Sequence, residues 1–409
     1  MSAINSGDTA FVLIATALVL LMTPGLAFFY GGLVRRKNIL SILMQCFVLM
    51  CVLSIQWILF GYSLAFGPSK GGIIGGLDWV GLRGVGMEPY KVYAATIPHQ
   101  LFMAFQMMFA VITPALIIGA FAERIKFSGF LVFSLLWATL VYDPMTHWMW
   151  GHGGWLKELG ALDFAGGIVV HINAGLAALV MAIMIGRRGE LIHPRAPHNL
   201  PFCVLGAGLL WFGWFGFNAG SALAANGTAV SAFIATNTAA AAAGITWMVL
   251  DYILNGVPTV LGIVTGLVAG LATVTPAAGF VSPLSAIAIG VLASLVCFFF
   301  VAKIKAIYGY DDSLDVFGVH GVGGVVGALA TGLFAEESIG GVNGLFFGNP
   351  KQFLIQLLAV GVSAAFTVIG TFLLFKLTDF LVGIRVDGKE ETIGLDISQQ
   401  HECGYTIID

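Results

Sequence analysis

Charged residues are scarce in this sequence. Of 409 residues, 10% are Asp, Glu, Lys or Arg and 58% are hydrophobic, whereas a soluble domain usually carries about 25% charged residues. So few charges cannot cover the surface of a water-soluble body of this size, so apolar surface must face lipid. The net charge of −3 is also small, and it predicts neither a nucleic-acid partner nor an acidic substrate.

Cysteine is also scarce, and its spacing excludes the common metal and redox motifs. The five cysteines are Cys46, Cys51, Cys203, Cys297 and Cys403. They form no CxxC pair, and the first four lie in or at the edge of apolar runs, where cysteine usually serves as a small core residue. The sequence therefore predicts no bound metal and no cofactor.

Long apolar runs are what the sequence has instead. A membrane-spanning helix needs about 20 mainly apolar residues. Eleven segments qualify as candidates: 9–34, 39–66, 98–122, 127–143, 165–186, 199–220, 228–252, 258–275, 283–306, 317–334 and 352–384. We therefore predict an all-α polytopic membrane protein with a transmembrane domain over 1–384. The polar, acidic segment 385–409 cannot insert and is expected to be a cytoplasmic tail.

The distribution of positive charge predicts the orientation of the helices. With the N-terminus outside, thirteen of the eighteen Lys and Arg residues lie on the inner side: Arg35, Arg36, Lys37, Arg124, Lys126, Arg187, Arg188, Arg195, Lys303, Lys305, Lys376, Arg385 and Lys389. The other five lie outside: Lys70, Arg83, Lys91, Lys157 and Lys351. This is the bias that the positive-inside rule requires, and an odd number of helices then leaves the C-terminus inside.

Two pairs of similar segments suggest an internal repeat. AFFYGG resembles FGFNAGS and aligns Phe29 with Phe217, while DFAGGIVVHINAG resembles DVFGVHGVGG and aligns His171 with His320. Helices one to five and six to ten would then be two halves, inverted relative to each other because five is odd. Inverted repeats commonly place the functional site at their interface near the bilayer midplane. We expect the two histidines to meet there, at a central pore.

Two histidines in apolar surroundings need an explanation, because ionisable residues inside a membrane are rare and usually mark a pathway or a cofactor. The pair could ligate haem, contribute to a metal site, or line a narrow pore in which each imidazole offers a hydrogen-bond donor and an acceptor. Aromatic residues favour the pore, because a cage of rings attracts a small cation by about 0.5–2 kcal/mol per contact. The candidates for this cage are Phe105, Phe109, Trp148, Trp150, Trp214, Phe215 and Phe217.

Several long motifs resemble those of the ammonium transporter family (Amt/Mep, related to Rh proteins). They are PGLAFFYGGLVRRKN at 24–38, GAFAERIKF at 119–127, ALDFAGGIVVHINAG at 161–175, GWFGFNAGS at 213–221 and DVFGVHGVGG at 315–324. The resemblance implies a homotrimer of eleven-helix protomers in the plasma membrane, each protomer with its own pore. It also implies a PII-type regulatory protein that binds the cytoplasmic tail.

The resemblance assigns roles to individual residues. An outer recruitment site for ammonium matches Phe109, Trp150 and Ser221. The family's phenylalanine gate matches Phe109 and Phe217, with Phe29 on the inner side, and the pore lining matches Trp214, His171 and His320. The family's outer aspartate matches Asp163, which we expect to act mainly as a helix cap. WGHGGWLKELGALD is one residue longer than the bacterial pattern, so Trp148 remains a rival to Trp150.

The expected function is transport, not enzymatic catalysis. Ammonium would be captured outside by the aromatic rings and the Ser221 hydroxyl, would lose its proton as it is desolvated, and would pass the histidines as NH3, with or without a following proton. The main alternative is an ammonium sensor that signals through its tail with little transport. A haem-binding electron carrier and a Rh-like channel for CO2 are further alternatives.

Overall fold

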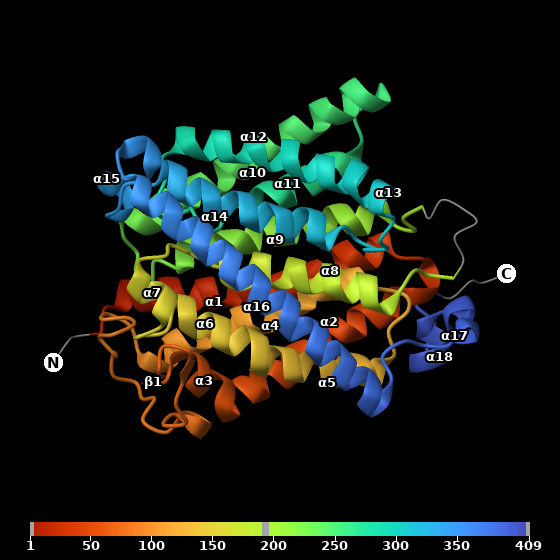
Figure 1. The fold of residues 1–409 in the computed structure, drawn as a ribbon, viewed down its shortest axis with the longest axis horizontal. Coiled ribbons are helices and arrows are strands. Elements are labelled where there is room, and N and C mark those ends of the chain that lie inside the picture. The colour runs from red at the N-terminus through yellow and green to blue at the C-terminus, as the bar shows by residue number, and fades with distance from the viewer. Residues whose placement is uncertain (1–3, 190–195, 406–409) are drawn as a thin grey trace.

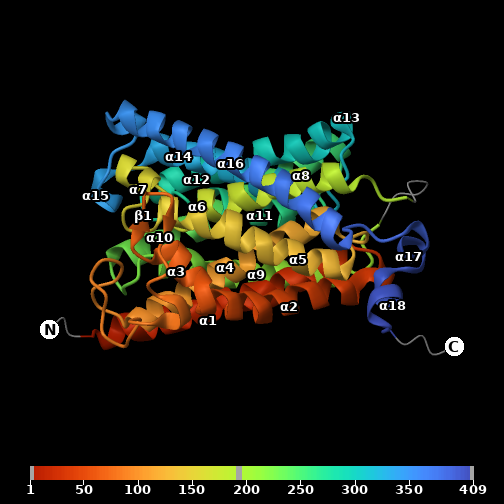
Figure 2. The same ribbon diagram turned by 60° about the horizontal axis from the view of Figure 1, so that its bottom comes forward.

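The computed structural model describes residues 4–189 and 196–405. Arg195 and residues 406–409 of the tail lie outside these ranges. Long helices run side by side along one direction, and Figures 1 and 2 show that the two ends of the bundle differ. One end, called here the N-terminal end, carries the N-terminus, α7 (Trp155–Leu159) and α15 (Glu337–Gly340). The other, called the tail end, carries α17 (Gly388–Ile393) and α18 (Leu395–Gln400).

Within the described residues, ten helical segments are long and apolar enough to cross a membrane. Five are α1 (Ser6–Leu33), α4 (His99–Phe121), α9 (Leu200–Gly220), α10 (Gly227–Asn255) and α16 (Pro350–Val382). The other five are composite: Arg36–Phe66, Phe127–Met149, Gly167–Ile185, Pro283–Tyr308 and Phe317–Phe334. The predicted segment 258–275 forms the shorter apolar helix α11 (Val260–Val274). The prediction of an all-α membrane protein is therefore confirmed, while the number of helices that cross stays a prediction.

Each composite segment contains one turn of π-helix, in which the backbone hydrogen bonds are one residue longer than in an α-helix. In the first composite segment, η2 (Trp57–Gly61) joins α2 (Ile39–Gln56) to α3 (Tyr62–Phe66). In the second, η4 (Ala138–Tyr142) joins α5 (Phe127–Trp137) to α6 (Asp143–Met149). In the third, η5 (Gly167–Ile172) leads into α8 (Asn173–Ile185), and in the fifth, η7 (Phe317–Gly321) leads into α14 (Val322–Phe334). In the fourth, η6 (Phe300–Ile304) joins α12 (Pro283–Phe299) to α13 (Lys305–Tyr308). π-turns often occur at functional sites, and η5 and η7 are the turns that contain His171 and His320.

The remaining elements are short. At the N-terminal end, β1 (Ser69–Lys70) and β2 (Ile74–Gly75) pair as antiparallel strands, with Ser69 opposite Gly75. Three 3₁₀ turns complete the connections: η1 (Arg36–Asn38), η3 (Val80–Leu82) and η8 (Leu345–Phe347). These loops and turns cap the ends of the bundle, whereas its sides carry exposed apolar side chains such as Leu284 (78% exposed) and Phe380 (87% exposed). Such a surface suits lipid rather than water.

The described part of the tail folds against the tail end of the bundle. The Asp396 carboxylate accepts hydrogen bonds from the backbone N–H groups of Leu40 (3.1 Å) and Ser41 (2.8 Å), at the start of α2. The Leu395 N–H donates to the Asn38 side chain at 2.8 Å. Because the first N–H groups of a helix have no partner within it, the tail supplies the cap that α2 lacks.

Buried charges hold the loops of the tail end together. Arg124, whose side chain is fully buried, donates to the carbonyl oxygens of Ala120 and Gly186 and to the Ser313 hydroxyl, at 2.7–2.9 Å. Its neighbour Glu123 accepts from Arg35 (3.1 Å) and Arg188 (2.9 Å). Sequence segments more than 60 residues apart are thus fixed to one another by charge-assisted hydrogen bonds.

Glu123→Gln is expected to lower the thermal stability at neutral pH by on the order of 3 kcal/mol, because it leaves two arginines without their shared carboxylate. Burial alone would raise the pKa of the Glu123 carboxyl, but Arg188 and Arg35 outweigh burial and hold this pKa below its ordinary value. A carboxyl of this kind stabilises the fold above its unfolded pKa of about 4.3. The contribution is lost as the pH falls through the lower, folded pKa.

Thermal unfolding in detergent, from about pH 5 to about pH 3, tests this prediction. The native protein should lose more stability over this range than Glu123→Gln. The control is Glu88→Gln, which removes an exposed carboxylate at the other end of the molecule. Equal acid sensitivity in the native protein and Glu123→Gln would contradict it.

Candidate functional site

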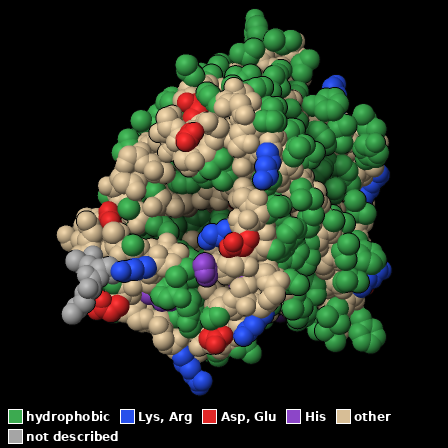
Figure 3. Space-filling view, turned by 60° about the vertical axis from the view of Figure 1, so that its left-hand side comes forward, with side chains coloured by type: hydrophobic (Ala, Val, Ile, Leu, Met, Phe, Trp, Pro, Cys, Tyr) green, Lys and Arg blue, Asp and Glu red, His purple; other side chains and the backbone are tan. Residues whose placement is uncertain are grey.

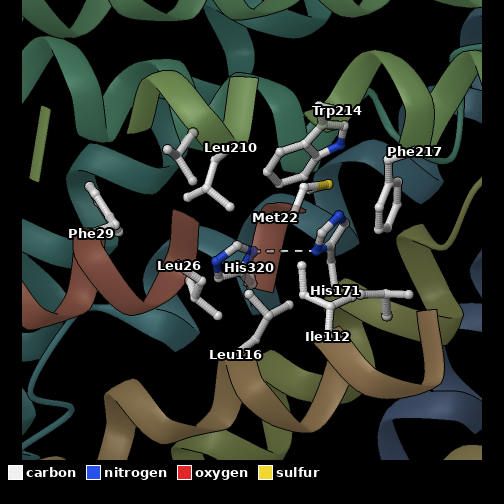
Figure 4. A pocket seen from close by; sticks show the side chains of 12 residues that line it. Met22, Leu26, Phe29, Ile112, Leu116, His171, Leu210, Trp214, Phe217 and His320 are labelled. Atoms are coloured by element: carbon white, nitrogen blue, oxygen red, sulfur yellow. Dashed lines mark hydrogen bonds between the residues drawn. The ribbon is translucent and has the colours of Figure 1, made fainter. Parts of the chain in front are cut away.

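The two histidines meet at the centre of the bundle. Figure 4 shows their rings facing each other, and the Nδ1 atoms of His171 and His320 lie 3.3 Å apart. Both residues are buried, with exposures of 1% and 4%. A hydrogen bond between two Nδ1 atoms requires a proton on one and a lone pair on the other. The two neutral rings therefore take opposite tautomers.

Glycines allow the two histidine helices to touch. A Cβ on Gly175 would lie 2.0 Å from the Gly321 nitrogen, and a Cβ on Gly324 would lie 2.8 Å from the Ile172 nitrogen. Gly175 and Gly324 are the residues four positions after each histidine. Since side chains four apart lie on the same face of a helix, each glycine permits the close backbone contact that brings the opposite imidazole within reach.

Asp163 fixes the start of the first histidine turn. Its carboxylate accepts four backbone N–H bonds, from Gly166, Gly167, Ile168 and Val169, at 2.6–3.0 Å. Burial raises the pKa of this carboxyl to about 6, and the four N–H donors oppose the shift. Asp163 thus has the geometry of a helix cap, and its own carbonyl oxygen accepts a bond from Trp150 Nε1 at 2.8 Å.

A narrow apolar cavity surrounds the histidine pair. It measures about 10 Å³ and is lined by Met22, Leu26, Phe29, Ile112, Leu116, Val170, His171, Leu210, Trp214, Phe217, Val268 and His320. One water molecule needs roughly 10–15 Å³ by the same measure, so the cavity admits one small molecule at most. The Trp214 ring stacks on His171 at 5.5 Å and is held by a bond from its Nε1 to the Thr275 hydroxyl at 2.9 Å.

Two phenylalanine rings separate this cavity from the N-terminal end. The ring centroids of Phe109 and Phe217 lie 4.3 Å apart, too close for anything to pass without ring movement. Phe217 lines the central cavity, and Phe109 meets the Trp150 ring edge-on at 5.8 Å. The pair therefore forms a closed barrier between the histidines and the region beyond Trp150.

Beyond this barrier the N-terminal end opens into a vestibule of about 160 Å³. Figure 3 shows this end of the molecule with a hollow whose rim carries basic, acidic and histidine side chains. The vestibule is lined by Phe66, Val92, Tyr93, Phe102, Gln106, Met149, Trp150, Lys157, Phe164, Ser221 and Leu223. The Ser221 hydroxyl donates to the Phe217 carbonyl oxygen at 2.8 Å, which leaves the lone pairs of its oxygen to accept bonds from a donor in the vestibule.

A third cavity lies on the other side of the histidines. It measures about 50 Å³, and Phe29 and His320 line both it and the central cavity. Figure 4 shows Phe29 and Phe217 on opposite sides of the histidine pair. Asp315 also lines the third cavity and forms an ion pair with Lys305 at 2.6 Å. Three cavities thus follow one another from the N-terminal end to the tail end.

The structure brings together the nine residues singled out in the sequence for the site, which are Phe29, Phe109, Trp150, Asp163, His171, Trp214, Phe217, Ser221 and His320. It also separates the two rival tryptophans. Trp150 lines the vestibule, whereas the Trp148 ring packs on Phe366 at 4.5 Å and its Nε1 donates to the Ile73 carbonyl oxygen. Phe215, one of the candidates for the aromatic cage, stacks on Phe233 at 4.1 Å and lines none of the three cavities.

Sequence reasoning missed several vestibule residues, among them Tyr93, Phe102, Gln106, Lys157 and Phe164. Phe102 and Gln106 precede Phe109 by seven and three residues, so helical spacing along α4 could have placed them on the same face. Tyr93 lies in a loop and Lys157 lies on the five-residue helix α7 between loops, so residue spacing carries no such signal for either.

The geometry does not favour the other histidine chemistries. Two nitrogens 3.3 Å apart in a cavity of about 10 Å³ leave no room for a porphyrin ring between them. Among residues 4–189 and 196–405, no three His, Cys, Asp or Glu side chains gather as a metal site would require. What the arrangement offers is a narrow route with polar ring edges at its centre.

Known proteins share both the sequence and the fold. A profile of the Ammonium Transporter Family matches residues 10–405. The ammonium transporter of Bacillus subtilis is 52% identical, over 98% of this chain and 98% of that protein. Ammonium transporter Amt1 of Archaeoglobus fulgidus is 48% identical, over 98% of this chain and 100% of that protein.

Solved structures are similar as well. Saccharomyces cerevisiae Mep2 superposes with a TM-score of 0.89 at 37% identity, covering 94% of this chain and 88% of that one. A structure described as a sensor Amt protein superposes with a TM-score of 0.89 at 32% identity, covering 96% and 98%.

Gly175→Ala tests the contact between the histidine helices. The added methyl group would collide with the backbone at Gly321, so we expect a loss of about 1–3 kcal/mol in stability from overpacking. The control is Gly361→Ala on α16, where an added Cβ meets nothing within 4 Å, and which should be neutral or slightly stabilising. Thermal unfolding in detergent measures both. If both variants unfold at the same temperature as the native protein, the contact does not constrain the helices.

Proposed function

The chain belongs to the ammonium transporter family, and we propose that it carries ammonium through the three cavities, from an outer vestibule at the N-terminal end to the cytoplasm at the tail end. The observation that carries this proposal is the buried histidine pair in a cavity that admits one small molecule, between Phe217 and Phe29. Such a route suits a neutral molecule the size of ammonia and excludes a hydrated ion.

The first step is capture of the ammonium ion in the vestibule. Trp150 lines the vestibule and Phe109 meets its ring edge-on, and a cation gains about 0.5–2 kcal/mol from each ring face. The Ser221 oxygen accepts one N–H bond of the ion, because its own proton is already donated to Phe217. Potassium has no N–H group and no proton to lose, so it gains less here and cannot take the next step.

The second step is transfer of a proton from the ion to water in the open vestibule, as the ion itself leaves that water. Moving a charge into an apolar, membrane-buried cavity costs several kcal/mol, whereas a small neutral amine loses little. Ammonia therefore passes the Phe109–Phe217 barrier when the rings move apart. It then lies among the lining side chains of the central cavity, where the imidazole edges of His171 and His320 replace its lost hydrogen bonds. Phe29 closes the route at its inner side.

The histidine pair also offers a path for the proton that ammonia leaves behind. The two rings share one hydrogen bond and have opposite tautomers, so a proton that enters one ring can leave from the other. Transport is then electrogenic, because a proton follows each molecule of ammonia. In this role Trp214 holds the His171 ring by stacking, and Asp163 holds the turn that carries it.

The wider assembly follows from the same family. We propose eleven transmembrane helices with α11 as the shortest, the N-terminus outside and the C-terminus inside the plasma membrane, and two inverted five-helix repeats. Each histidine lies in a π-turn and precedes a contact glycine by four residues, which supports the repeat. A homotrimer would cover part of the apolar side of the bundle. The folded tail offers a surface to a PII-type regulator.

The deciding experiment is the ammonium-evoked current of the purified protein in liposomes on a solid-supported membrane, with potassium as the ionic control. We expect a saturable current with ammonium and none with potassium. His171→Ala and His320→Ala should each abolish the current, because each breaks the shared hydrogen bond. The matched control is His401→Asn, which removes a histidine from the tail at a φ of 58° that Asn tolerates. Unchanged current and selectivity in both pore variants would contradict the mechanism.

The same experiment addresses the sensor alternative, which draws its support from the sensor Amt protein of similar fold. If ammonium binds but evokes no current, a pH-linked uptake assay separates the two remaining functions. Uptake without current means electroneutral conduction of ammonia. Binding without uptake means a sensor.

A further inference from the structure

Lys157 places a positive charge in the vestibule of a protein proposed to recruit a cation there. It lies on α7 and lines the vestibule together with Trp150 and Ser221. Its Nζ donates to the Trp150 carbonyl oxygen at 2.9 Å and lies 5.8 Å from the centre of the Tyr93 ring. A like charge at this point opposes the capture of ammonium, so its position needs an explanation.

The surface that receives the Lys157 ammonium group is rigid. The Tyr93 hydroxyl donates to the Phe66 carbonyl oxygen at 2.6 Å and accepts from the His152 N–H at 3.0 Å. The Tyr93 ring stacks on Phe102 at 4.9 Å with an interplanar angle of 9°. These contacts hold the ring in place, and Lys157 Nζ lies between it and the Trp150 carbonyl oxygen.

The contacts of the lysine are those that a free ammonium ion would make. Both cations carry N–H donors on a compact charged nitrogen, and both are attracted to a ring face within about 6 Å of its centre. We propose that the Tyr93 ring and the Trp150 carbonyl oxygen form a second, outer ammonium position, which Lys157 fills as a tethered competitor. This inference rests on the proposed function, since it concerns the affinity with which the vestibule takes up its substrate.

The Lys157 side chain can be displaced from this position. Lys157 is exposed as a residue, so its side chain can leave the ring and extend into water. Burial lowers the pKa of its amine below the ordinary value, although Glu158 opposes the shift. An incoming ammonium ion therefore competes with a group whose bond to Trp150 is open to water.

Lys157→Met tests the inference, because it keeps the apolar stem and removes the charge. In the current assay we expect the KM for ammonium to fall about three- to tenfold at low salt, from the loss of both competition and repulsion. The maximal current, which is determined by the barrier and the histidines, should change by less than twofold. Lys157→Arg keeps the positive charge and should therefore have the native KM. Above about 0.5 M salt, the part of the fall in KM that comes from charge repulsion should become smaller, because salt screens exposed charges.

The control is Lys351→Met, which removes an exposed lysine of the same end at the start of α16, outside the vestibule. An equal fall in KM for both variants, or none for Lys157→Met, would overturn the inference. Adding Tyr93→Leu to Lys157→Met should remove the part of the gain in affinity that comes from the second position and leave the part that comes from lost repulsion. A double variant that keeps the whole gain would overturn the second position. Absence of any ammonium flux in the native protein would instead sink the proposed transport function.

Discussion

The close contact between the two histidine helices is the constraint on which the rest of the site depends. Two buried imidazoles can share a hydrogen bond only if their backbones approach closely, and Gly175 and Gly324 permit this approach. The contact also leaves so little space that the central cavity holds a single small molecule. A hydrated ion does not fit into so small a space.

Polar groups placed inside or at the edge of an apolar body need partners, and the fold supplies them at both ends. At the N-terminal end the Asp163 carboxylate receives four backbone N–H groups. At the tail end Arg124 satisfies carbonyl oxygens of several loops, and Asp396 caps α2. Unpaired, each of these groups would cost on the order of a few kcal/mol. The apolar helices set the overall shape, while these few charges fix how the helices end.

Much of this fold could be predicted from the sequence, because lipid imposes a simple rule on length and polarity. The apolar runs predicted the spanning segments, and 258–275 forms a shorter helix because Thr259 caps its start and turns follow Val274. The repeated histidine motif predicted the pair at the centre. Spacing could not choose between Trp148 and Trp150, because two positions along a helix turn a side chain to a different side. The π-turns were not predicted, because an apolar run indicates the length of a helix and not the spacing of its hydrogen bonds. Lys157 escaped notice as one of several outer lysines.

Asp163 connects the vestibule to the turn that carries His171. Its carbonyl oxygen holds the Trp150 ring of the vestibule, and its carboxylate holds the turn that carries His171. These bonds connect the vestibule wall to the pore centre through Asp163. A substitution that moved Trp150 would therefore act on the turn that carries His171 through these bonds. Lys157 also touches this connection, because its Nζ donates to the Trp150 carbonyl oxygen, whereas the Tyr93 hydroxyl is bonded to Phe66 and His152 instead.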